Sequence, residues 1–132
     1  MKKLISIIIG LLILGLVPIT NAAPIDATIS GIDLTITYTE PTLNVGGSPL
    51  LDLDKTTIYI NPSNAPIFTR EVAASSPTGG GNIIQVITVI VNEGEEIDVE
   101  VWATASDRSS NESASSPIKF KRIDRLAPAA IK

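Results

Sequence analysis

Two stretches of the chain have an apolar residue at every second position, and this alternation constrains the fold more than any other feature of the sequence. In residues 32–39 the apolar positions are Ile32, Leu34, Ile36 and Tyr38. In residues 97–105 they are Ile97, Val99, Val101, Ala103 and Ala105. A period of two residues places each set of side chains on one face of a β-strand. Both stretches therefore predict half-buried antiparallel strands.

Further strand-like runs recur along the chain, and turn-forming residues separate them. These runs occupy residues 27–30, 56–60, 67–73 and 83–91, and a last one includes Ile118 and Phe120. Proline, glycine and asparagine cluster between the runs. The stretch from Pro77 to Asn82, with three consecutive glycines, predicts a mobile loop. Seven short strands without a helical period between them predict an all-β sandwich of antiparallel sheets.

The run at residues 83–91 is apolar at almost every position, so it does not show which face is buried. One interpretation is a strand that is covered on both sides, which is the one we expect. The other is a strand whose outer side is a binding or assembly surface. In that case an edge or apolar strand would pair with another chain.

The first 22 residues have the features of a signal peptide. Lys2 and Lys3 precede an apolar run at residues 4–19, and small residues follow at 20–22. We expect a helical signal peptide that is cleaved, so that the protein is secreted or periplasmic and meets the membrane only during export. An uncleaved anchor is the alternative, although the run is shorter than the span of a bilayer.

Composition limits the partners and the chemistry of the exported protein. The chain has no cysteine, so no disulfide framework supplements its core. Without Lys2 and Lys3, eight basic residues stand against fourteen acidic ones, which disfavours binding to nucleic acid or to an anionic membrane. About 110 residues form one domain, and we expect a monomer or a weakly associating protein whose partner is another protein or a carbohydrate.

Two blocks of sequence resemble the fibronectin type III family. In the first, an alternating run ends in Ala105-Ser106-Asp107 and a small-residue turn leads to Asn111-Glu112-Ser113. In the second, Thr39-Glu40-Pro41 precedes Ser48-Pro49-Leu50-Leu51-Asp52-Leu53 and then Ile58-Tyr59. The resemblance implies a seven-stranded, antiparallel, immunoglobulin-like sandwich at residues 24–124. Tyr38 departs from the pattern, because it stands where the family usually has tryptophan.

The resemblance also implies a role and a domain organisation. Members of the family usually act as spacers, adhesion units or binding accessories, and the fold hosts many partners. Residues 125–132 resemble the linker that follows such a module. Two hypotheses remain open for this tail: it docks a partner, or the chain is part of a longer multidomain protein.

Three groups of residues are candidates for binding a partner. Alternation points Trp102, the only tryptophan, away from the core, where it would stack on a sugar or anchor a protein. The alternative is that it packs under a loop or against Lys and Arg side chains. The loop that joins the last two strands, called the FG loop in the family, contributes Arg108, Ser109, Ser110, Asn111 and Glu112. The basic end of the chain contributes Lys119, Lys121 and Arg122.

Catalysis finds little support, because the chain has neither histidine nor cysteine. A carboxylate-based hydrolase is a distant alternative. Asp52, Asp54 and Asn44 are conceivable calcium ligands, but their spacing matches no calcium loop, and we expect no metal and no cofactor. The sequence favours a non-catalytic binding or structural module at the cell envelope or outside the cell.

Overall fold

The computed structural model describes residues 25–131, and within them it contains seven strands and no helix. The predicted signal peptide lies outside the described residues. No helix within the described range is long and apolar enough to cross a membrane. The strands are β1 (Asp26–Ser30), β2 (Asp33–Thr39), β3 (Leu53–Pro62), β4 (Phe68–Ala73), β5 (Asn82–Thr88), β6 (Glu96–Asp107) and β7 (Lys119–Asp124).

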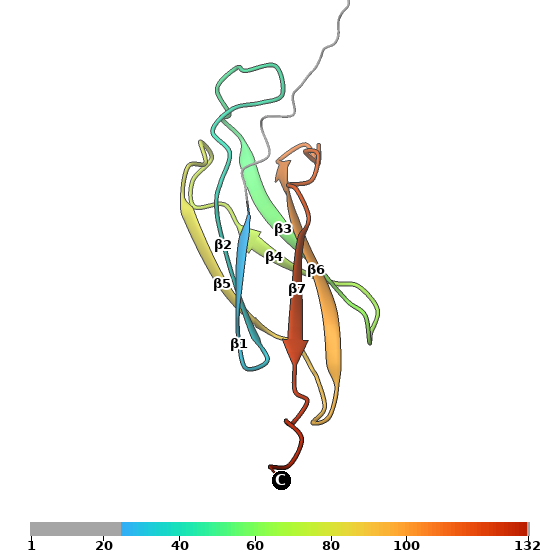
Figure 1. The fold of residues 1–132 in the computed structure, drawn as a ribbon. Helices are drawn as coiled ribbons and strands as arrows, with labels where there is room; N and C mark the ends of the chain where they lie inside the picture. Colours follow the sequence, from blue (N-terminus) through green and yellow to red (C-terminus); the bar gives the residue numbers. More distant parts are fainter. Residues whose placement is uncertain (1–24, 132) are drawn as a thin grey trace, which may run out of the picture.

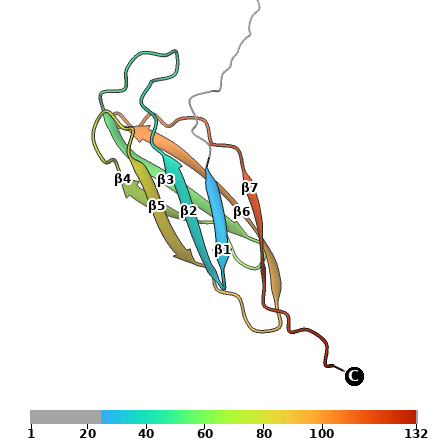
Figure 2. The same cartoon turned by 60° about the vertical axis from the view of Figure 1, so that its left-hand side comes forward.

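The strands form two antiparallel sheets that face each other as layers of a β-sandwich (Figures 1 and 2). One sheet has the order β1-β2-β5 and the other has the order β4-β3-β6-β7. The predicted all-β sandwich is therefore confirmed, and all seven predicted strands are present. Along one side β1 contacts β7, and along the other Arg70 Nη1 of β4 donates a hydrogen bond to Gln85 Oε1 of β5 at 3.3 Å.

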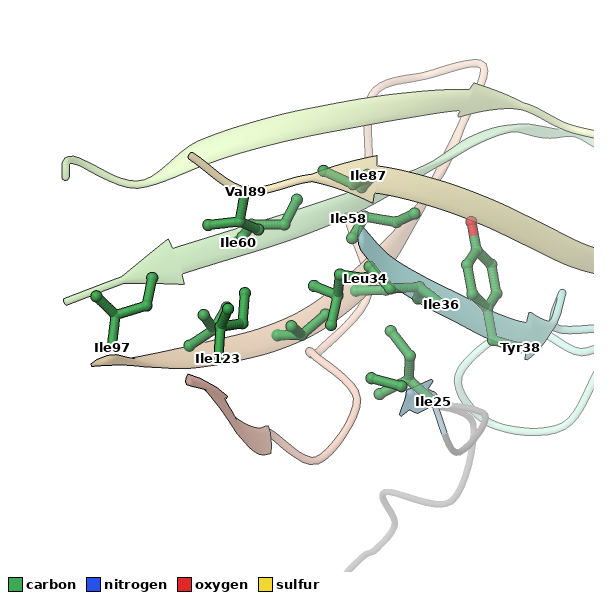
Figure 3. Close-up of a cluster of buried hydrophobic side chains, with 14 of the residues drawn as sticks. Ile25, Leu34, Ile36, Tyr38, Ile58, Ile60, Ile87, Val89, Ile97 and Ile123 are labelled. Atoms are coloured by element: carbon green, nitrogen blue, oxygen red, sulfur yellow. The ribbon is translucent and has the colours of Figure 1, made fainter. Parts of the chain in front are cut away.

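Alternation along the strands determines which side chains enter the core. Leu34 and Ile36 of β2 are fully buried, as are Val99 and Val101 of β6. Ile58 and Ile60 of β3 and Ile87 of β5 meet them between the layers (Figure 3). Each such side chain contributes roughly 1.5–3 kcal/mol by leaving water, so burial of branched aliphatic residues takes the place of disulfide bonds. Tyr38 closes one end of this cluster, where its hydroxyl and that of Thr56 share a hydrogen bond of 2.5 Å.

One carboxylate is buried beside the core. Glu40 follows β2, is only 2% exposed, and accepts hydrogen bonds from the Ser75 and Gly81 backbone N–H groups at 2.9 and 3.0 Å and from the Ser75 hydroxyl. Its own N–H donates to the Gly81 carbonyl at 2.9 Å. Gly81, the last residue of the glycine run, is therefore anchored to the chain after β2 by a distant residue, a contact that the sequence pattern does not predict.

Strand β5 differs from the expectation that both of its sides are buried. Ile87 and Val89 enter the core, but Ile84, Val86 and Ile90 are 65%, 55% and 73% exposed. The reason is that β5 lies at the edge of a sheet whose outer side is covered by no other described element. The alternative interpretation, an apolar outer surface, agrees with the structure.

Candidate functional site

Trp102 lies on the outer side of the four-stranded sheet, as alternation along β6 predicts. It is directly opposite Tyr59 of β3 in the antiparallel register. The two rings are parallel, with an angle of 5° between their planes and 5.4 Å between their centroids. Trp102 is half-buried, and it packs on this neighbouring ring. The stack holds the indole upright on the sheet, where cross-strand aromatic pairs are stabilising.

A third aromatic ring shares this side of the sheet. Phe120 of β7 is opposite Glu100 of β6, and residues opposite each other in a register point to the same face. Its side chain is 69% exposed. Tyr59, Trp102 and Phe120 therefore form a surface on three adjacent strands that we call the aromatic face.

A shallow hollow of about 540 Å³ adjoins Phe120. Its lining residues are Asn61, Ser63, Asp98, Glu100, Phe120, Lys121 and Arg122. Asn61 Nδ2 donates to Glu100 Oε1 at 2.9 Å, and Arg122 Nε donates to Asp98 Oδ1 at 3.0 Å. An apolar ring beside amide, carboxylate and guanidinium groups can hold a sugar ring or the side chains of a protein, because such ligands combine apolar faces with hydrogen-bonding groups.

The FG loop is exposed at the same end of the sandwich as the long loop at residues 40–52 (Figure 1). Asp107, the last residue of β6, organises it. Its Oδ1 accepts hydrogen bonds from the Ser109 and Asn111 N–H groups at 2.9 Å, and its Oδ2 accepts one from Asn111 Nδ2. These hydrogen bonds, above all those from Asn111, lower the pKa of Asp107. Ser110 has a φ of +67°, unique among non-glycine residues of the described range.

Glu112 connects the FG loop to the aromatic face. Its Oε2 accepts hydrogen bonds from the Tyr59 hydroxyl at 2.7 Å and the Thr104 hydroxyl at 2.5 Å. The hydrogen bond from Thr104 and then that from Tyr59 lower the pKa of Glu112, and the same carboxylate raises the pKa of Tyr59. The loop and the stacked rings are therefore positioned by one carboxylate.

The basic residues at the end of the chain do not form one patch. Lys119 and Lys121 are opposite Val101 and Val99, so they lie on the other face of β7 from Phe120, although Lys121 also contributes to the lining of the hollow. Arg122 is on the outer side, where its guanidinium pairs with Asp98 at 3.0 Å and Glu96 at 3.3 Å. Arg108 belongs to the FG loop at the far end of β6. The alternation of β7 divides charges that are neighbours in the sequence.

Tyr59, Asn61, Glu100 and Phe120 belong to this surface although they are not among the candidates from the sequence. The signal was present, because Tyr59 and Asn61 are out of phase with the buried Ile58 and Ile60 of the same strand. Grouping these residues into one surface also requires knowing which strands lie side by side, and the sequence does not show this. Among residues 25–131, no three or more acidic side chains come together in a group able to hold a metal ion.

Comparison of the chain with protein-family models and with curated protein sequences finds no match. The aromatic face, the hollow and the FG loop are the features of the described residues that suit the binding of a ligand. All three are on the outer side of the four-stranded sheet or at its end.

We expect replacement of Glu112 by glutamine to lower the pKa of Tyr59, because the carboxylate is the main cause of its elevation above 10.0. Tyr38 is the internal control, since burial is the main cause of its raised pKa. Absorbance of the two phenolates, with Tyr38→Phe to assign them, measures both values. An unchanged Tyr59 pKa would contradict the contact.

The Glu112 carboxylate also makes the stability of the fold depend on pH. The folded pKa of Glu112 lies below its ordinary value of 4.5, so its hydrogen bonds stabilise the fold above that pH. This contribution is lost as the pH falls through the folded pKa. In chemical denaturation series below about pH 4.5, Glu112→Gln should therefore lose less stability than the parent protein. Parallel stability curves for the two proteins would argue against this role.

Proposed function

We propose that this protein is a non-catalytic, secreted binding module of the fibronectin type III type. It mediates contacts with a protein or a carbohydrate at the cell envelope or outside the cell. The observation that carries the proposal is the aromatic face, where the stacked rings of Tyr59 and Trp102 stand beside the exposed ring of Phe120. Aromatic side chains presented on a rigid sheet provide contact area at a low cost in conformational entropy.

The strand order supports the fibronectin type III assignment. In a constant-type immunoglobulin sandwich the fourth strand joins the sheet that contains the first two. Here β4 pairs with β3, in the sheet that also contains β6 and β7. The order agrees with the family that the two sequence blocks resemble, and the signal-like residues 1–22 support export.

Two features of the hollow support binding without catalysis. Asp98 is engaged by the Arg122 guanidinium, and Glu100 accepts a hydrogen bond from Asn61. A carboxylate-based hydrolase needs two carboxyl groups that flank the bond to be cleaved and are free to act on it. Carboxylates held by an arginine and an amide suit hydrogen bonding to a ligand instead.

Binding is testable through the single tryptophan. We expect Trp102 fluorescence to change when the protein binds its ligand, with soluble polysaccharides and purified surface or matrix proteins as the two sets of probes. Trp102→Ala and Phe120→Ala should then each weaken binding about tenfold or more, because central aromatic residues dominate such surfaces. Calorimetry measures the variants without relying on fluorescence.

Ile90→Ala is the matched control for these substitutions. Ile90 is 73% exposed but follows β5, in the other sheet, so its loss should leave the affinity unchanged. If binding survives both Trp102→Ala and replacement of residues 108–112, the aromatic face and the FG loop are not the binding surface.

A second candidate function is that of an envelope assembly subunit that pairs with another chain through an edge strand. The specific observation in its favour is the exposed apolar outer side of β5, formed by Ile84 and Val86. This surface belongs to the three-stranded sheet, so the two functions are separable by mutation.

A further inference from the structure

Strand β5 has a backbone edge with which no other described strand pairs, although the Arg70 side chain of β4 donates a hydrogen bond to the Gln85 side chain there. It is the last strand of its sheet and pairs only with β2 (Figure 2). Proteins usually protect such edges with charged residues, proline or bulges, because unpaired backbone groups attract other strands. The sequence of β5, Asn-Ile-Ile-Gln-Val-Ile-Thr, contains no charge and no proline. The β2–β5 register is also free of shifts, so the edge is regular.

The register identifies the backbone groups at this edge. The Val89 N–H donates to the Ile32 carbonyl at 3.0 Å, so this pair is a hydrogen-bonded one. Hydrogen-bonded and non-hydrogen-bonded pairs alternate along an antiparallel ladder. Ile87, Gln85 and Ile83 therefore direct their N–H and C=O groups toward β2. Those of Asn82, Ile84, Val86 and Thr88 point to the open edge.

The sequence of β5 is nearly palindromic about Gln85. Reading outward from Gln85, Ile84 corresponds to Val86, Ile83 to Ile87, and Asn82 to Thr88. An antiparallel partner of the same sequence would thus place apolar residues opposite apolar ones and polar opposite polar. Such a twofold arrangement is self-complementary, as a closed dimer requires.

We propose that β5 pairs with β5 of a second copy of this chain, antiparallel and centred on Gln85. Ile84 and Val86 of opposite copies then form hydrogen-bonded pairs, as do Asn82 and Thr88, and all four residues have their backbone groups at the open edge. Gln85 meets its counterpart on the twofold axis as a non-hydrogen-bonded pair. Pairing joins the two three-stranded sheets into one continuous sheet.

Charge favours a second copy at this edge over other surfaces of the molecule. The chain carries a net charge of −4, so most contacts between copies bring like charges together. Strand β5 itself has no charged side chain, and Arg70 of β4 is the charged residue that contacts it, through the hydrogen bond to Gln85 Oε1 at 3.3 Å. Ile84 and Val86, on the outer side of the strand, lose apolar exposure when the copies pair. A strand pair of this length buries less than a standard interface of roughly 1,600 Å², so we expect a weak dimer with a Kd of about 10–100 μM. Pairing at β5 refines the second candidate function and does not involve the aromatic face.

Sedimentation equilibrium tests the association. Residues 23–132 contain all seven strands and the whole described core, so a protein of this length is suitable. We expect dimers to accumulate between about 10 μM and 1 mM, and Val86→Lys to weaken dimerisation at least tenfold by placing two charges in the interface. Ile90→Lys, also at an exposed apolar position but outside β5, is the control for charge and should have a much smaller effect.

A cysteine pair tests the register itself. The parent chain has no cysteine, and Cα atoms of a non-hydrogen-bonded pair are about 4.5 Å apart, which suits a disulfide. Under mild oxidation, Gln85→Cys should form covalent dimers more than tenfold faster than Thr88→Cys, because Thr88 is opposite Asn82 of the second copy. Both variants should show the far-ultraviolet circular dichroism of the parent protein.

Two results would overturn the inference. One is a strict monomer at about 1 mM, and the other is equal crosslinking of Gln85→Cys and Thr88→Cys. A complex with a different chain that Val86→Lys abolishes, in a protein that does not self-associate, would assign the edge to that chain instead. Ligand binding by the aromatic face should survive Val86→Lys, so this test and that of the binding function fail independently.

Discussion

Replacement of Gly79 by alanine is expected to destabilise the protein by about 3 kcal/mol, through a strained backbone and a steric overlap. Gly79 has a φ of +68°, which costs an L-residue about 1–2 kcal/mol. A Cβ atom at this position would overlap the Pro41 carbonyl oxygen and approach Leu53 Cδ2 to 3.3 Å. Overlap with packed backbone adds roughly 1–3 kcal/mol.

The Pro41 carbonyl has little freedom to retreat, because its neighbour Glu40 is hydrogen-bonded to Gly81 through both backbone and side chain. Gly46→Ala is the matched control. Gly46 also has a positive φ, +99°, but nothing lies within 4 Å of the position of its Cβ. Its replacement should cost only the backbone contribution of about 1–2 kcal/mol. Urea denaturation measures the free energy of unfolding of both variants. Equal losses of stability would mean that the contact with Pro41 does not constrain the fold.

Replacement of Glu40 by alanine is expected to cost about 3 kcal/mol. The buried carboxylate accepts hydrogen bonds from two backbone N–H groups, at Ser75 and Gly81, and from the Ser75 hydroxyl. Removing it leaves these donors without an acceptor in a site where Glu40 is 2% exposed. Each buried donor left unsatisfied costs about 1–3 kcal/mol, and partial access of water to the empty site limits the sum.

Two variants define what Glu40 contributes. Glu40→Gln keeps one acceptor oxygen but turns an amide NH₂ toward N–H donors. Its free energy of unfolding should therefore lie between those of the parent protein and Glu40→Ala. Glu71→Ala removes an exposed carboxylate whose ion pair with Lys55 spans 2.8 Å, and should cost less than about 1 kcal/mol. Thermal and urea denaturation provide the values. If Glu40→Ala loses as little stability as Glu71→Ala, the Ser75 and Gly81 N–H groups find other hydrogen-bond acceptors.

The strands and the direction of their side chains were predictable because they depend on local periodicity. Alternation in β2 and β6 identified the buried Leu34, Ile36, Val99 and Val101, and it placed Trp102 on the opposite face. A one-residue error in phase would exchange the two faces of a strand, so an apolar residue at every second position leaves one solution. Strand β5 lacks this alternation, and the prediction of its buried side was accordingly wrong.

The amino-acid sequence by itself determined that this chain forms an antiparallel β-sandwich and that Trp102 faces away from its core. The tertiary structure alone decided that Tyr59 stacks on Trp102, that Glu40 is buried on the glycine run, and that Arg122 but not Lys121 shares a face with Phe120. The physical reason is the separation in sequence over which each effect acts. Periodicity acts within one strand, whereas each of these contacts joins residues from different strands or loops, and their positions depend on which strands become neighbours and in what register.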